Sequence, residues 1–315
     1  VEKLWEVAIP ATVANIGDVR NGMGWNGKFY LTDKNKQQVR VFSKNGEDAD
    51  AAIDIKLPDT SVEKMVAQYD TTKNEEGTIV KIDTTYNKVT EQVSHTLGTG
   101  IAIDDAGNIV LGTNFPNSVV SVAIIKQGEK SAKVIDLALP KTGRCDQINA
   151  FGDIFSEQGG FVFFYISGAT QLQYAKIAKG ELVEVKAMEG KVFAGASPSQ
   201  VLYGSETKAV ANARGGASMQ IVENGVVTDI MPKGAITNDL GGAVFSIGEN
   251  EVWAYKVGTV HSSEFSVRNM TTQQFAADKD GNTVHYFIDN KAAANNSYAN
   301  FTKAEKINDY AYYLN

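Results

Sequence analysis

The chain has 315 residues, of which 43% are hydrophobic and 21% are charged, and its formal net charge is −7. This hydrophobic content is sufficient for a sizeable core, and the interspersed charges describe an ordinary solvated surface. Nucleic-acid binding needs a basic face for the phosphates, which an acidic chain without a run of Lys or Arg does not offer. We therefore expect no nucleic-acid partner and no binding to an anionic membrane surface.

The sequence contains no stretch that predicts a membrane-spanning helix. Its most apolar run, Phe161–Ile166, has the length of a strand, far below the roughly 20 residues of a spanning helix. The single cysteine, Cys145, cannot form an internal disulfide, and we expect a small buried side chain rather than a nucleophile. The chain starts at Val1 without a charged n-region or an apolar h-region, so we expect any signal peptide to have been removed.

Helix signals are scarce along the chain. Apolar residues at helical spacing predict a helical turn or two at Asp59–Gln68 and in the Lys291–Lys306 region. Elsewhere, short runs rich in Val, Ile, Phe, Tyr and Thr alternate with Gly, Asn and Asp turns, which is typical of strands. The sequence therefore predicts an all-β chain.

The clearest strand pattern is Gly22–Phe42, GMGWNGKFYLTDKNKQQVRVF. Asn26-Gly27, flanked by alternating apolar residues, predicts a tight hairpin turn, and a third strand follows a polar loop. The same unit, an apolar strand, a polar turn and a more aromatic or β-branched strand, recurs along the chain. Its further copies are Gly100–Asn114, Phe151–Gly168, Val201–Ala213, Ala243–Lys256 and Phe275–Asp289.

The spacing of these copies predicts a β-propeller. The first two turns are two repeat lengths apart, so we expect a divergent copy between them, at Met65–Asp83. A four-stranded repeat of roughly 40–50 residues is typical of propellers, and the copies predict seven blades in a single domain over residues 1–315. Trp5–Ile9 and Tyr310–Leu314 are expected to share the last blade and close the ring. The alternative of two sandwiches would need a linker near mid-chain, and no Pro/Gly/Ser-rich linker is evident.

The opening unit resembles a known family. Arg20–Tyr30, RNGMGWNGKFY, followed by LTDKNKQQVRVF, is similar to the first blade of seven-bladed propeller proteins of unknown function from Bacteroidetes. The resemblance covers the blade pattern over most of the chain. Members of that family are usually exported or surface-anchored, and some are described as carbohydrate-related. The resemblance therefore implies an exported protein, periplasmic or at the cell surface, and it transfers no catalytic residue.

Polar side chains precede the first strand of most units, where a propeller chain returns to the central axis. If these loops share one face, their amides and carboxylates form a polar ring at the mouth of the axial channel. Such a ring suits hydrogen bonding to a sugar, a peptide or another polar ligand, whereas a purely structural role would be to cap strand ends and bind channel water. The candidate ligand-binding residues are Asp18, Arg20, Asn21, Asp146, Gln147, Asn149, Gln200, Asn238 and Asp239.

No motif predicts a metal site, a cofactor or a nucleophile. His95, His261 and His285 are far apart, and no H-E-x-x-H or paired-cysteine pattern occurs. The run Asp278–Asn282 resembles the start of a calcium loop, but neither the Gly nor the Glu of an EF-hand stands at the required position, so we interpret it as a hairpin turn. There is no G-x-S-x-G motif and no phosphate-binding glycine loop. We therefore expect no cofactor and no metal.

Repeat architecture without a catalytic motif favours a non-catalytic propeller that binds a ligand or a partner, with carbohydrate as one candidate ligand. The alternative is a glycoside hydrolase or lyase that uses axial carboxylates; Asp18, Asp146, Asp239 and Glu206 are available, and their spacing selects no pair. That alternative needs two carboxyl groups within about 5–10 Å across an open pocket. A third hypothesis, a protein-binding hub, predicts an exposed apolar patch on one face.

Overall fold

The computed structural model describes residues 22–33, 36–42, 52–55, 57, 59–93, 96–113, 121–145, 147–194, 196–214, 218–230, 242–247, 249–256, 264–269, 274–275, 285–287, 304–308 and 311–314. Within these residues the regular structure consists of strands, numbered β1 to β25, and contains no helix. The predicted all-β class is therefore confirmed. The chain divides into two compact units, one formed by Leu57–His95 and the other by the remaining residues.

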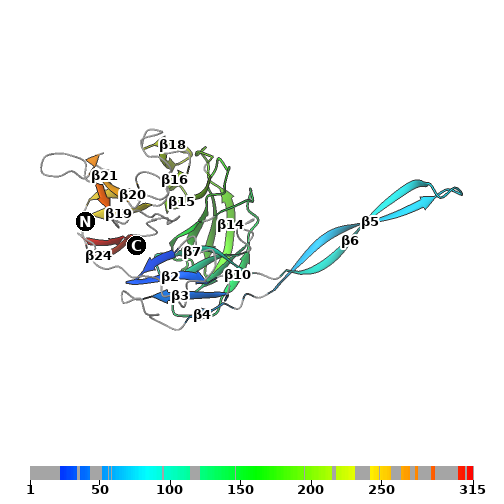
Figure 1. Cartoon of the computed structure of the whole chain (residues 1–315), viewed down its shortest axis with the longest axis horizontal. Helices are drawn as coiled ribbons and strands as arrows, with labels where there is room; N and C mark the ends of the chain where they lie inside the picture. The colour runs from blue at the N-terminus through cyan, green and yellow to red at the C-terminus, as the bar shows by residue number, and fades with distance from the viewer. Residues whose placement is uncertain are drawn as a thin grey trace. The chain divides into compact units, whose positions relative to one another are not determined.

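Four sheets of the larger unit each contain four antiparallel strands, and neighbours in the sheet are neighbours in the chain (Figure 1). Because consecutive strands pair, each sheet is a simple meander joined by turns, as the repeated unit predicts. The sheets consist of β1 (Gly22–Trp25), β2 (Lys28–Asp33), β3 (Gln38–Phe42) and β4 (Ile53–Asp54); β7 (Leu97–Ile103), β8 (Ile109–Thr113), β9 (Ser121–Ile125) and β10 (Lys133–Asp136); β11 (Ile148–Gly152), β12 (Gly160–Phe164), β13 (Gln173–Ala178) and β14 (Glu181–Ala187); and β15 (Ala196–Gly204), β16 (Lys208–Arg214), β17 (Ser218–Glu223) and β18 (Val226–Asp229).

A fifth sheet begins in the same way but ends differently. Its first three strands, β19 (Gly242–Ile247), β20 (Asn250–Lys256) and β21 (Glu264–Asn269), form a meander. Two short strands, β22 (Gln274–Phe275) and β23 (His285–Phe287), then both pair with β21. The described residues of Phe275–Asp289 therefore complete the fifth sheet, and the prediction that they begin a separate blade is wrong.

The first strands of successive sheets lie against one another. β1 contacts β7, β7 contacts β11, β11 contacts β15, and β15 contacts β19. Next to β19 lies a ribbon of β24 (Ala304–Asn308) and β25 (Ala311–Leu314). Four-stranded meanders with adjacent innermost strands are the blades of a β-propeller, and the predicted fold is confirmed. The predicted strand at Trp5–Ile9 lies outside the described residues, so closure of the ring and the number of seven blades stay predictions.

The blades have apolar central strands because each blade is covered on both faces. Every residue of β8 (IVLGT) and of β9 (SVAII) is buried. Between the third and fourth sheets, Phe163 and Tyr174 pack with Val201 and Ala211 in one core cluster. Strands buried on both faces read as continuous apolar runs, which explains why alternation is weak in the centre of each unit.

The hydroxyl of Tyr165 also stabilises this core, because it donates a hydrogen bond of 2.5 Å to the carbonyl oxygen of Phe193. Burial raises the pKa of the Tyr165 phenol, so it remains a donor throughout the physiological range. We expect Tyr165→Phe to lower the free energy of unfolding by about 1–2 kcal/mol, because a carbonyl loses its donor. Urea titration measures this loss. The exposed Tyr203, changed to Phe, is the control, and an equal loss in both variants would contradict the assigned bond.

Turn chemistry confirms the predicted hairpins. In the first unit, Asn26 and Gly27 have φ values of 51° and 69°, the left-handed conformation that a two-residue type I′ turn needs. The ring of Trp25 fills the space beside Gly107, where an added Cβ would lie 2.3 Å from a ring atom. Trp25 therefore packs the first sheet against the turn of the second.

The smaller unit is a long hairpin of β5 (Thr60–Lys73) and β6 (Ile79–Val93), the pair of cyan arrows in Figure 1. Among the residues that the structure describes, no third strand joins this two-stranded sheet. Met65–Asp83, predicted as a blade, is instead part of this hairpin. The helical prediction for Asp59–Gln68 is wrong as well, because nearly all of that segment is β5. Of the second predicted helical region, Lys291–Lys306, only the part within β24 is described, and it is a strand.

Candidate functional site

Three residues of the predicted axial ring are described, and all three are buried. Gln147, Asn149 and Gln200 are each less than 10% exposed. The Oδ1 atom of Asn149 accepts a hydrogen bond of 3.2 Å from the backbone N–H of Val201, which ties β11 to β15. The other predicted ring members, Asp18, Arg20, Asn21, Asp146, Asn238 and Asp239, lie outside the described residues. The polar ring therefore stays a prediction.

A buried amide that the sequence reasoning missed lies beside this group. Asn212 stands opposite Gln200 across β15 and β16, and its side chain is 1% exposed. Neither its Oδ1 nor its Nδ2 atom has a hydrogen-bond partner among the described residues. Buried polar atoms are nearly always paired, so this amide marks a place where a water molecule or a polar ligand group would be favourable. In the sequence, the indication of this buried amide is a single Asn within the otherwise apolar run AVANA.

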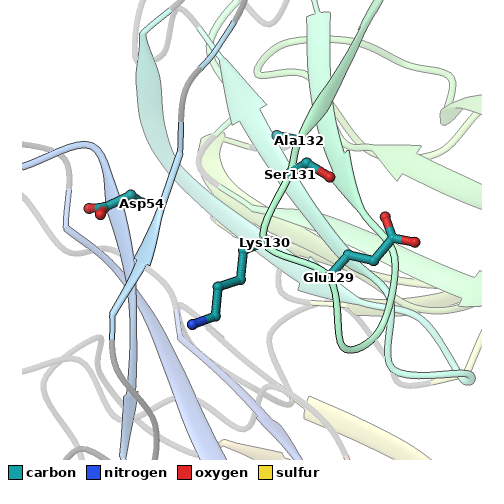
Figure 2. A pocket seen from close by; sticks show the side chains of 5 residues that line it. All are labelled: Asp54, Glu129, Lys130, Ser131 and Ala132. Atoms are coloured by element: carbon teal, nitrogen blue, oxygen red, sulfur yellow. The ribbon is translucent and has the colours of Figure 1, made fainter.

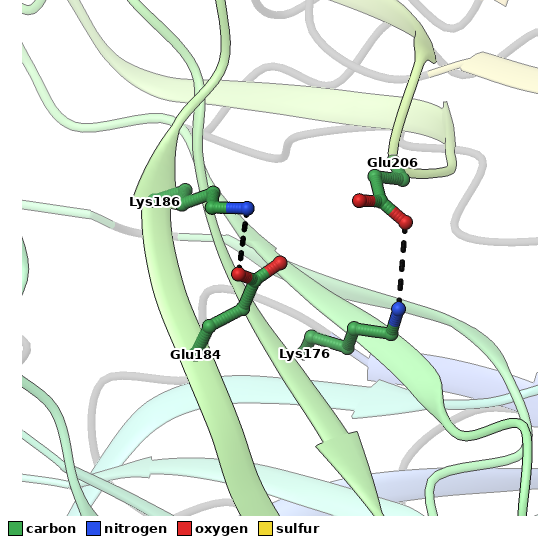
Figure 3. Close-up of polar contacts among 4 residues, drawn as sticks. All are labelled: Lys176, Glu184, Lys186 and Glu206. Carbon is green, nitrogen blue, oxygen red and sulfur yellow. Dashed lines mark hydrogen bonds and ion pairs between the residues drawn. The ribbon is translucent and has the colours of Figure 1, made fainter.

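Among the carboxylates considered for catalysis, only Glu206 is described. It is exposed and forms an ion pair of 3.4 Å with Lys176, which links the third sheet to the β15–β16 turn (Figure 3). Beside it, Glu184 pairs with Lys186 at 2.6 Å, and the hydrogen bond to Glu184 raises the pKa of Lys186. Exposed pairs of this kind contribute little to stability and describe an ordinary charged surface. The other three candidate carboxylates lie outside the described residues.

A surface hollow of about 560 Å³ lies between Asp54 at the end of β4 and the turn between β9 and β10. Figure 2 shows Lys130 extending into this space, whereas Glu129 points away from it. The carboxylate of Asp54 already accepts a hydrogen bond of 2.5 Å from the Nε2 atom of Gln38. The turn residues are exposed, so the hollow offers open charged surface and no enclosed set of polar groups.

The described residues give no sign of metal or thiol chemistry. No group of three or more His, Cys, Asp or Glu side chains among them is arranged to hold a metal ion. Cys145 is buried as predicted, and its Sγ atom donates to the carbonyl oxygen of Gln147 at 3.0 Å. In the part of the chain that the structure describes, no helix is long and apolar enough to cross a membrane.

A row of exposed apolar side chains lies on the β5–β6 hairpin. Side chains alternate between the two faces of a strand, so the strand register assigns Met65, Tyr69, Ile82 and Tyr86 to the same face. These four side chains are 60%, 65%, 59% and 65% exposed. Together with Ala67 they form what we call the apolar face. Single exposed apolar residues are common, but a contiguous row of large ones marks an interaction surface.

Polar pairs surround the apolar face. On the same side of the hairpin, Glu63 pairs with Lys88 at 2.6 Å next to Met65. The opposite side carries an ion pair between Lys64 and Glu91 and a hydrogen bond of 2.8 Å from Asn87 to Gln68. The hairpin is therefore amphipathic, with its large apolar residues concentrated on one side.

The turn of the hairpin is well formed. Asn74 closes it, because its Oδ1 atom accepts hydrogen bonds from the N–H groups of Glu76 and Thr78 at 3.1 and 2.9 Å. Gly77 takes the left-handed φ of 81° that this turn requires. A lone two-stranded hairpin is at best marginally stable in water, and a third strand or a covering layer stabilises it. The described residues supply neither a third strand nor a covering layer for this hairpin.

Comparison with protein-family models finds no match, and no curated protein matches the sequence. Among solved structures, BBS1N in complex with ARL6DN is 10% identical with a TM-score of 0.45, over 98% of this chain and 91% of that one. The dihydro-heme d1 dehydrogenase NirN in complex with DHE is 12% identical with a TM-score of 0.44, over 82% of this chain and 55% of that one. This chain therefore spans only about half the length of NirN. AztD from Citrobacter koseri is 11% identical with a TM-score of 0.41, over 85% of this chain and 72% of that one. Likeness at this level identifies neither family nor function.

Proposed function

We propose that this protein is a non-catalytic propeller that binds a protein partner through the apolar face of the β5–β6 hairpin. The observation that carries the proposal is the exposure of about 60% of Met65, Tyr69, Ile82 and Tyr86 on one side of a two-stranded sheet. Burying large aromatic and aliphatic side chains is the main source of affinity in protein interfaces. The hub hypothesis predicts such a patch.

The partner is inferred to be a polypeptide and not a small molecule. Small ligands bind in concave pockets, whereas this surface is the face of an open sheet. Strands β5 and β6 have 14 and 15 residues, and each has one edge that pairs with no other described strand. An edge of this length offers backbone N–H and C=O groups to an added strand, which is a common mode of peptide recognition.

Paired variants of the full-length chain test this function. Tyr69→Ser and Tyr86→Ser remove aromatic rings from the apolar face, whereas Val66→Ser and Val89→Ser change exposed apolar residues on the opposite face. Proteins captured by the wild type are identified, purified and titrated against all four variants by calorimetry. Tyr69→Ser is expected to bind about 30-fold more weakly, since losing an interface hot spot costs about 2 kcal/mol, and Tyr86→Ser is expected to do the same where the partner also covers β6. Equal affinity of the tyrosine and valine variants would reject the proposal.

A second candidate function is binding of a small polar ligand near the inner strands, and Asn212 is the observation that favours it. Its unpaired amide is adjacent in the sheet to Gln200 and close in the fold to the Asn149–Val201 hydrogen bond. A screen of glycans and polar metabolites on purified protein tests this function. Any hit is titrated again with Arg20→Ala, Asn149→Ala and Asn212→Ala. Unchanged affinity in all three variants would reject an axial ligand site.

A further inference from the structure

We propose that the partner of the β5–β6 hairpin is a second copy of this chain, and that the two copies pair through the free edges of their β5 strands. This inference rests on the proposed function, because it names the polypeptide that the hairpin binds. The sequence at the centre of β5, Lys64–Asp70, reads KMVAQYD.

The centre of β5 is complementary to itself. When two copies of one strand pair antiparallel about a two-fold axis, residues at equal distances on either side of the axis stand opposite one another. With the axis at Ala67, Met65 faces Tyr69 of the second copy, and Lys64 faces Asp70 of the second copy. Each contact occurs twice. Directly opposite residues point to the same side of the sheet, so the Met–Tyr contacts lie on the apolar face and the Lys–Asp contacts on the other side.

Each of these contacts has favourable chemistry. The methionine sulfur packs well against the edge of an aromatic ring. Opposite charges on facing residues stabilise a strand pair, and like charges destabilise it. From Ser61 to Lys73, pairing about Ala67 places no two like charges opposite one another.

Charge balance favours the β5 edge over the β6 edge. Each charged residue of β6 already has an ion-pair partner within the hairpin: Lys81 with Asp83, Lys88 with Glu63, and Glu91 with Lys64. On β5, Asp70 forms no ion pair with any residue that the structure describes. Lys64 of the second copy stands directly opposite Asp70, so its ammonium lies between this carboxylate and Glu91 of its own hairpin.

The pairing also completes the sheet. Two hairpins joined at β5 form one four-stranded sheet, which has the strand number of an independently stable sheet. The edge from Ser61 to Lys73 adds about ten backbone hydrogen bonds, a number typical of a protein interface. Between Thr60 and Thr72 the β5–β6 register is continuous and the strand contains no proline, so no bulge or missing donor blocks the free edge.

Disulfide trapping tests the position of the two-fold axis. Residues directly opposite in an antiparallel pair have Cα atoms about 4.5–5.5 Å apart, a separation that a disulfide can bridge. We expect Ala67→Cys in the full chain to give a disulfide-linked dimer under mild oxidation. The matched control is Thr84→Cys, on the same face but on β6, and it is expected to stay uncrosslinked. The wild type supplies no background, because its Cys145 is buried. Crosslinking of Tyr86→Cys without crosslinking at Ala67 would place the axis on β6 and overturn the inference.

Charge exchange tests the same interface in solution by analytical ultracentrifugation. The wild type is expected to dimerise reversibly, and Asp70→Lys to raise the dimer dissociation constant at least tenfold. The double variant Lys64→Asp with Asp70→Lys again places opposite charges at the facing positions 64 and 70. It is therefore expected to recover most of the affinity. The control exchange, Glu63→Lys with Lys88→Glu, swaps a pair within the hairpin and is expected to leave the dimer unchanged.

The possible failures separate this inference from the proposed function. A monomeric wild type that binds another protein with a loss of affinity at Tyr69→Ser would overturn the self-pairing and retain the binding function. A dimer unaffected by Asp70→Lys and not crosslinked at Ala67 would overturn the self-pairing and place the contact elsewhere. A monomer with no binding that depends on Tyr69 would overturn both.

Discussion

Replacing Phe163 by Ala is expected to lower the free energy of unfolding by about 3–5 kcal/mol, the cost of emptying a fully enclosed aromatic site. The ring is completely buried in the core between the third and fourth sheets. It packs edge-on against Phe151 at a centroid distance of 6.0 Å and lies 5.5 Å from Tyr174. These neighbours are themselves held in strands, so the cavity cannot collapse and the full cost remains. Urea titration followed by circular dichroism measures the loss.

Two further variants distinguish a packing effect from a general loss of β-structure. Phe161 is on the same strand but only partly buried, so Phe161→Ala is expected to cost clearly less. Gly204 touches Phe163 across the blades, and a Cβ there would lie 2.3 Å from the ring. Gly204→Ala alone is therefore expected to destabilise by about 1–3 kcal/mol through overpacking. In the Phe163→Ala background, the same change enters an empty space. Additive costs in the double variant would contradict the assigned contact.

Much of the fold was predictable from the sequence, because tight turns and strand pairing are local. The Asn26-Gly27 turn is identified by residues that accept a positive φ, and Asn224-Gly225 repeats it with φ values of 49° and 80°. The predicted units at Gly100–Asn114 and Phe151–Gly168 each overlap the first strand of a sheet and contain its second strand. Where the turn residues accept a positive φ and both flanking segments have the composition of strands, the hairpin is specified without knowledge of the rest of the fold.

The errors arise where local signals do not determine which strands pair. Met65–Asp83 has alternating strands and a polar turn, as the blades do, and the hairpin itself is present. What distinguishes it is the high content of charged and polar residues along both of its strands, in contrast to the central blade strands, which are buried on both faces. In Phe275–Asp289, β22 and β23 both pair with β21, and nothing in their own sequence identifies that strand as the partner.

The candidate interaction surface was partly predictable. The alternation that assigns Tyr69 and Tyr86 to one face can be read from the sequence once the register of the hairpin is known. The exposure of that face cannot be read, because it depends on whether another layer of the fold packs on it. For Asn212, the sequence shows an amide in an apolar run, but only the structure shows that its polar atoms are unpaired.

One polar network connects the second and third sheets and carries the second large prediction. Asp104 is completely buried in the β7–β8 turn. Its Oδ1 atom accepts hydrogen bonds from the N–H groups of Ala106 and Asn108 at 3.0 and 2.8 Å. Its Oδ2 atom accepts from the Asn108 side chain at 2.8 Å and from the backbone N–H of Ile154 at 3.0 Å. The side chain of Asn108 also donates to Asp153 at 3.0 Å, so the network joins the turns of two sheets.

Asp104→Ala is expected to lower the free energy of unfolding by about 3–5 kcal/mol at pH 5, because it leaves several buried donors without an acceptor. The matched control is the neighbouring Asp105, which is exposed and accepts a hydrogen bond from the N–H of Gly152 at 2.8 Å. Asp105→Ala is expected to cost no more than about 1 kcal/mol. Equal losses in the two variants would show that the network around Asp104 does not carry the stability assigned to it.

The cost of Asp104→Ala is also expected to depend on pH, in a direction set by the environment of the carboxyl group. Burial raises the pKa of Asp104 above its ordinary value of 3.8, and the hydrogen bonds from Asn108 and from the backbone offset only part of this. The native protein therefore holds the proton more tightly than the unfolded chain does. The stability from this linkage is fully present below the unfolded pKa and is lost as the pH rises through the folded pKa. Because alanine does not titrate, the measured cost should shrink across that window and then level off. A cost that grows with pH would mean that the four donors stabilise the carboxylate more than burial destabilises it.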